Sequence, residues 1–118
     1  MKTDLQKRLR EVMRYIYEDT SVMEYIKEAS SELANIVQKY PRLVREAGIF
    51  AFLTFAILPE VVIDVLSDPS NTDMSIEAVQ LQVIERLKER VEFLRNHREI
   101  LEKAIQQRVA PTLLQFMA

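Results

Sequence analysis

Apolar residues recur every three or four positions through the first third of the chain, with polar and charged residues between them. This spacing gathers them into one stripe along a helix, so the pattern predicts amphipathic helices and not strands. A first helix is predicted over residues 3–18, and its stripe consists of Leu5, Leu9, Val12 and Ile16. A second helix is predicted over residues 22–40, and Pro41 ends or kinks it.

The middle of the chain holds its most apolar stretch. Residues 41–47 are predicted to form one or two helical turns, with the proline at the first helical position. Gly48 follows, and we expect this glycine at a helix start, packed closely on another backbone. Residues 49–58 are apolar on every side, which is typical of a helix in the middle of a core. Pro59 is predicted to interrupt that helix, and a further amphipathic helix follows over residues 60–67.

The last part of the chain begins with its clearest loop, residues 68–75, which are rich in turn and cap formers. A long helix is predicted over residues 76–110, and Pro111 ends its pattern. Arg98 interrupts the heptad seam of this helix, so one continuous helix and two helices with a break near residues 96–97 both stay open. The seam can be buried inside the bundle or can meet a partner at one end.

Together these patterns predict one all-α domain over residues 1–118, a compact bundle of five or six helices with a buried apolar central helix and a long C-terminal helix. A chain of this length can bury a core without disulfides or metals. Its single glycine supports helices joined by short loops, because tight hairpin turns need residues with positive φ. The absence of cysteine excludes disulfides, thiol catalysis and thiolate metal sites, and it suits a reducing cytosol.

The sequence predicts neither a signal peptide nor a membrane span. The first residues lack the apolar core of a signal peptide. The longest apolar run, residues 47–58, is shorter than the roughly 20 residues that a membrane helix needs. We therefore expect a cytoplasmic protein with no membrane partner.

Side chains that could carry catalysis are sparse. His97 is the only histidine, and its charged neighbours favour a surface position over a catalytic one. No Gly-rich phosphate-binding loop is possible with a single glycine. Glutamates four residues apart could hold a metal, but no histidine accompanies them and solvated helix faces explain them better; these pairs are Glu28 with Glu32 and Glu85 with Glu89. We expect no enzymatic activity, no metal, no cofactor and no small-molecule substrate.

Basic residues cluster at three places, although the net charge of −2 gives no global attraction to nucleic acid. The clusters are Lys7, Arg10 and Arg14 on one face of the first helix, Lys39, Arg42 and Arg45 around the proline, and Arg86 and Arg90 on the last helix. Each could contact phosphates, but the spacing alone favours solvated faces balanced by nearby acids. The phenylalanines at positions 50, 52 and 55 could stack on bases, but their apolar neighbours favour core packing.

One segment follows a pattern that is found in a known family. It reads Ala34-Asn-Ile36-Val37-Gln-Lys39-Tyr-Pro41, then Gly48-Ile49 after six residues, then Leu53-Thr-Phe55. This segment resembles the small-subunit family of type III-B (Cmr) CRISPR effector complexes, in which a helix ends in Ala-x-aliphatic-Val-x-Lys-x-Pro and Gly-aliphatic and Leu-x-Phe follow. It also fits a small subunit of a related CRISPR effector complex.

The resemblance implies a non-catalytic subunit that stacks along a ribonucleoprotein filament. Its implied partners are other effector-complex subunits, copies of itself, and the backbone of guide or target RNA, contacted without sequence specificity. The residues proposed for that contact are Lys39, Arg42 and Arg45, followed by Lys7, Arg10 and Arg14. The alternative is a helical adaptor or dimerisation module that binds only proteins.

Overall fold

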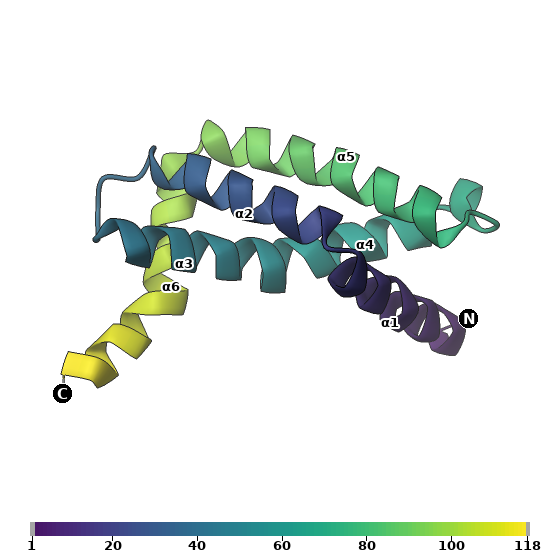
Figure 1. The fold of residues 1–118 in the computed structure, drawn as a ribbon, viewed down its shortest axis with the longest axis horizontal. Helices are drawn as coiled ribbons and strands as arrows, with labels where there is room; N and C mark the ends of the chain where they lie inside the picture. The colour runs from purple at the N-terminus through teal and green to yellow at the C-terminus, as the bar shows by residue number, and fades with distance from the viewer. Residues whose placement is uncertain (1, 118) are drawn as a thin grey trace.

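The chain folds into helices joined by short connections (Figure 1). The computed structural model describes residues 2–117, and the side chains of residues 4–107. No strand occurs in this range, which confirms the predicted all-α bundle. In chain order the described elements are α1 (Lys2–Asp19), α2 (Ser21–Ala34), α3 (Arg42–Phe52), the π-helical segment η1 (Leu53–Ile57), α4 (Leu58–Ser67), the 3-10 turn η2 (Pro69–Asn71), α5 (Ile76–Arg95) and α6 (Arg98–Met117).

The segments α3, η1 and α4 join into one continuous rod, Arg42–Ser67, around which the other helices pack. In Figure 1, α2 and α5 run beside this rod, and α1 angles away from its α4 end. The first part of α6 packs on α3, and the C-terminal end of α6 points away from the bundle. The rod therefore contacts α1, α2, α5 and α6 directly.

The core lies on one face of the rod. Buried aliphatic side chains from the rod meet those of α1, α2, α5 and α6, and the rod contributes Ile49, Leu53, Ile57, Leu58, Val61, Val62 and Val65. The prediction that residues 49–58 are buried on every side is wrong. Phe55 is 65% exposed, and Phe50 and Phe52 are only partly buried. The sequence is apolar all round, but neighbouring helices cover only part of the rod's circumference.

Pro59 does not interrupt the helix, contrary to the prediction. A proline lacks the amide hydrogen for an α-helical bond, and its ring crowds the carbonyl four residues earlier. The chain widens by one residue just before the proline, where the Leu58 amide donates to the carbonyl of Leu53, five residues back. The rod thereby continues for 26 residues.

By length and composition alone, this continuous rod could cross a membrane. It extends well beyond residues 47–58, the apolar run from which the sequence predicted no membrane span. Buried helices of soluble proteins reach the same length and composition. Of its most apolar 18-residue stretch, 44% is buried inside the bundle. The rod is thus a core helix on one side and a largely uncovered helix on the other.

Gly48 lies inside α3 and not at a helix start, so that part of the prediction is wrong. Its φ is negative, and the residue is buried. The glycine is therefore not needed for a left-handed conformation. Gly48 instead occupies a buried position in α3, a helix that contacts both α2 and α6, and a residue without a Cβ permits a close approach there.

Two predicted helix boundaries also differ from the structure. The helix α2 ends at Ala34, and residues 35–41 form a connection in which Tyr40 has a φ of 77°. The long C-terminal helix is divided at residues 96–97, the position that the sequence left open, and α6 then continues past Pro111 to Met117. At the division, the His97 ring stacks on Phe93 with its centroid 4.0 Å away.

Gly48→Val should lower the free energy of unfolding by about 1–3 kcal/mol, because the buried contact has no space for a branched side chain. Ala47→Val is the matched control, since Ala47 is the exposed neighbour in the same helix. Urea unfolding followed by circular dichroism measures both. Equal losses for the two variants would show that the glycine has no packing role.

Candidate nucleic-acid interface

Arg45, one of the three basic residues around the proline, caps the end of α2. Its side chain is partly buried, and one guanidinium nitrogen donates to the carbonyls of Ala34, at 2.7 Å, and Val37. The last carbonyls of a helix have no partner within the helix, and a cation there also suits the helix dipole. Arg45 is thus engaged in holding the chain together.

Arg42 has a similar role one turn earlier in α3. Its guanidinium lies 3.1 Å from a carboxylate oxygen of Glu46 and donates to the side chain of Asn35 and to Ser31. The side chain is about half exposed, at 49%. Arg42 and Arg45 therefore tie the start of α3 to the end of α2, across the connection at residues 35–41.

Lys39 is the one member of this basic cluster that faces solvent without an ion pair among residues 4–107. Its ammonium lies 5.6 Å from the centre of the Tyr40 ring. Beside it, a surface depression is lined by Lys103 and by the acids Glu99 and Glu102. The structure thus brings the three predicted cations into one region, but it does not present them as one free ridge.

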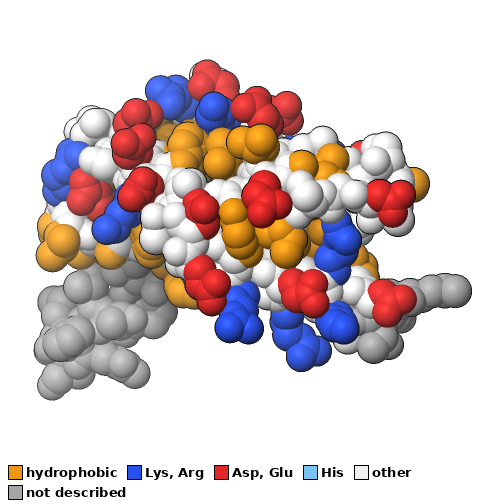
Figure 2. Space-filling model, turned by 45° about the vertical axis from the view of Figure 1, so that its right-hand side comes forward, with side chains coloured by type: hydrophobic (Ala, Val, Ile, Leu, Met, Phe, Trp, Pro, Cys, Tyr) orange, Lys and Arg blue, Asp and Glu red, His pale blue; other side chains and the backbone are white. Residues whose placement is uncertain are grey.

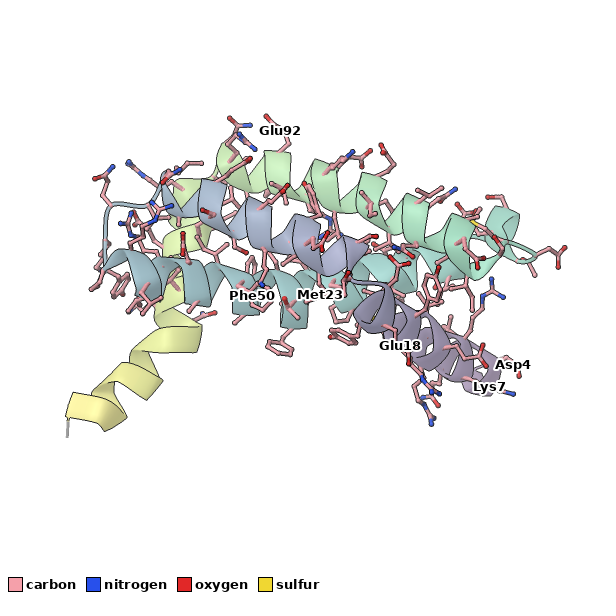
Figure 3. All side chains as sticks on the ribbon, viewed as in Figure 1. Asp4, Lys7, Glu18, Met23, Phe50 and Glu92 are labelled. Carbon is pink, nitrogen blue, oxygen red and sulfur yellow. The ribbon has the colours of Figure 1, made fainter. Side chains whose placement is uncertain are left out.

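The second predicted set, Lys7, Arg10 and Arg14, lies along the exposed face of α1, and we call it the α1 ridge. Figure 2 shows Lys and Arg side chains between carboxylates along the lower edge of the molecule, where α1 lies, and Figure 3 labels Lys7 there. Arg14 is 81% exposed and pairs with Glu18 at 3.1 Å. Within the side chains that the structure describes, the other two cations form no ion pair.

The position of α1 depends on two long-range contacts that the sequence did not predict. Arg8 points inward from α1 and donates to the carbonyl of Met74 at 2.7 Å. At the other end of the helix, Asp19 accepts from the Ser21 hydroxyl at 2.6 Å and from the Gln80 amide at 3.0 Å. These two hydrogen bonds, the Ser21 bond first, lower the pKa of the Asp19 carboxyl. The bond between Asp19 and Ser21 could be predicted locally, because an Asp two residues before a Ser is typical of a helix junction. The bond from Gln80 could not, because Gln80 is distant in the sequence.

The third basic cluster is also engaged. Arg90 lies 3.4 Å from Glu60 and 3.5 Å from Asp64, so it joins α5 to α4. Arg86 lies 3.8 Å from Asp68. These pairs are partly exposed and each contributes little stability, but they leave these two arginines less free to meet an external phosphate.

The glutamates that are spaced four residues apart lie on exposed faces of α2 and α5. Glu32 pairs with Arg95 at 3.2 Å. Among the described residues, no group of three or more His, Asp or Glu side chains is arranged to hold a metal ion. Of the cations in the three predicted clusters, Lys7, Arg10 and Lys39 are exposed and form no ion pair within the described side chains.

Arg45→Ala should lower the free energy of unfolding by about 1–3 kcal/mol, because it leaves partly buried carbonyls at the end of α2 without a donor. Lys39→Ala, from the same cluster, should change it by less than about 0.5 kcal/mol. Urea unfolding of both variants distinguishes the capping role of Arg45 from the solvent-exposed position of Lys39. A neutral Arg45→Ala would contradict the capping role.

Asp19 should contribute to a pH dependence of stability. Its pKa is lowered by folding from the ordinary value of 3.8, so its ionised form stabilises the fold above that pH and the contribution disappears as the pH falls through the folded-state pKa. Between about pH 4 and pH 2, the free energy of unfolding should therefore fall more steeply for the wild type than for Asp19→Asn. Parallel pH profiles from urea unfolding would contradict this role of Asp19.

No family model matches this sequence, and no curated protein or solved structure matches it significantly. The resemblance of residues 34–55 to the CRISPR small subunits therefore rests on the motif residues alone.

Proposed function

We propose that this chain is a non-catalytic helical subunit of a cytoplasmic CRISPR RNA-guided effector complex. In this role it packs beside other subunits and contacts the backbone of the guide or target RNA without reading its sequence. Two features support the proposal: the motif over residues 34–55, and the exposed cations of α1.

The α1 ridge is the observation that carries the RNA contact. Its three cations are spaced three and four residues apart, so they span about 10 Å along one helix face. Contacts between exposed cations and phosphates provide affinity and orientation without sequence information. Acids on the same helix, including Glu18, reduce the local positive charge, so we expect weak binding that adds to the contacts of an assembly.

Lys39 is the second contact point in this proposal, and it is the one member of its cluster whose cation is available. Arg42 and Arg45 contribute indirectly, because they fix the connection on which Lys39 lies. This reverses the order that the sequence suggested. The reason is physical, because a guanidinium that already satisfies carbonyl and carboxylate oxygens must lose those bonds before it can bind a phosphate.

Salt-dependent binding of a fluorescent single-stranded oligouridine RNA tests the α1 ridge. Replacing Lys7, Arg10 and Arg14 together by Ala should weaken binding and make the plot of log K against log salt shallower by about 2, since each phosphate contact on a single strand contributes about 0.7. The matched control replaces three exposed lysines on other helices, Lys27, Lys88 and Lys103.

Equal effects of the two triple variants would contradict a role for the α1 ridge and indicate general charge attraction. No binding by the wild type at about 50 mM salt, alone and when assembled with candidate backbone subunits, would overturn the RNA role. That outcome would favour the second candidate, an adaptor that binds only proteins. A specific feature supports this alternative, namely the uncovered apolar side of the rod.

A further inference from the structure

An apolar strip runs along the uncovered side of the rod. It consists of Leu43, Ala47, Ala51 and Phe55, which follow one another at four-residue intervals. Leu43 is 78% exposed and Phe55 is 65% exposed. Side chains at this spacing form one of the ridges by which helices pack together, and the two small alanines in its middle leave space for a close approach.

The strip borders a groove that continues toward α2. Phe50, labelled in Figure 3, lines this groove of about 350 Å³ together with Leu43, Ala47 and the α2 residues Lys27 and Ser30. The groove is also lined by Ser31 and Glu46, so its apolar part is the side of α3. Exposed apolar side chains gathered on one face of a small protein mark a contact surface. The strip belongs to the part of the rod that neighbouring helices leave uncovered, since only 44% of the rod's most apolar 18-residue stretch is buried.

The chain itself carries a segment that suits this strip. Residues 109–117 contain no charged side chain, and Val109, Leu113 and Phe116 recur four and three positions apart, as on one helix face. We call these residues the apolar tail. They belong to α6, which runs as one helix to Met117 and whose end points away from the bundle in Figure 1.

The tail cannot cover the strip of its own chain without a break in α6, because the helix carries it away from the body. The extended arrangement agrees with a radius of gyration of 15.6 Å, against about 13.5 Å for a compact domain of this length. The tail of a second molecule can reach the strip without such a break in α6.

We propose that a second copy of this chain covers the strip, so that the apolar tail of each copy docks on the apolar strip of the other. The contact is a helix laid against a groove, and it is reciprocal in a two-fold dimer. The strip spans about 18 Å and the tail about 13 Å, so the lengths are compatible. The residues of both segments lack charge. Of the charged residues that line the adjoining groove, Lys27 is exposed at its edge and Glu46 is paired with Arg42, so the contact need not bury an unpaired ion. This self-association needs no nucleic acid and stands apart from the proposed RNA contact.

Sedimentation equilibrium of the full chain between about 5 and 200 µM, in about 500 mM salt to suppress ionic contacts, tests the dimer. The wild type should dimerise, and Phe55→Lys in the strip and Leu113→Glu in the tail should each raise the dissociation constant by about tenfold or more. Leu81→Glu is the matched control, because Leu81 on α5 is 67% exposed and lies outside the strip. Circular dichroism should show that every variant retains its helices.

Mixing the Phe55→Lys and Leu113→Glu variants identifies the occupant. In a mixed dimer, one interface is wild type, and the other brings the introduced positive charge of one chain against the introduced negative charge of its partner. The mixture should therefore associate more tightly than either variant alone. A monomeric wild type, or a dimer that Leu113→Glu leaves intact, overturns the proposal.

Two further outcomes would also count against it. Absence of rescue on mixing overturns exchange of the tails between chains. An equal effect of Leu81→Glu overturns the assignment of the strip, because any exposed charge would then disrupt association. None of these results depends on RNA binding.

Discussion

The structure depends on the burial of one face of a single 26-residue rod, Arg42–Ser67. Its aliphatic residues meet stripes from the surrounding helices, and this burial supplies most of the free energy that holds a small helical domain together. The deviation from regular helix geometry serves this continuity. The π-helical segment lets the rod pass Pro59 without losing its buried face. Gly48, in regular helical conformation, contributes a buried position without a side chain.

The second constraint is the connection between α2 and α3, which two arginines secure. Arg45 binds carbonyls at the end of α2, while Arg42 reaches Asn35 and Ser31. Such hydrogen bonds are made by charged donors and are stronger than neutral ones. They explain why a seven-residue connection, with Tyr40 at positive φ, holds a defined conformation between two helices.

The helices themselves were predictable from the sequence, because Val12, Ile16, Val22 and Ile26 fall on the three-and-four spacing and are all buried. The errors arise where distant residues decide the outcome. Local rules end a helix at Pro59, but the gain from a continuous buried face favours a widened turn. A stretch that is apolar all round does not reveal how many neighbours will cover it, so Phe55 was misplaced. For the candidate interface, the spacing identified the exposed face of α1, but no local pattern shows that Arg45 is occupied by carbonyls eight and eleven residues earlier in the chain.

The difference between available and engaged cations decides where this chain can meet a polyanion. With a net charge of −2, attraction must come from local groups whose positive charge is not already compensated. Arg42, Arg86 and Arg90 face carboxylates within 4 Å, and Arg45 faces carbonyls. Among the described side chains, the exposed cations without an ion pair include Lys7 and Arg10 of the α1 ridge and Lys39, whereas Arg14 of the ridge pairs with Glu18. The apolar strip differs from these cations in its response to salt, since salt weakens an ionic contact but leaves an apolar one intact. The two proposed contacts therefore do not exclude each other, and a change of ionic strength separates them experimentally.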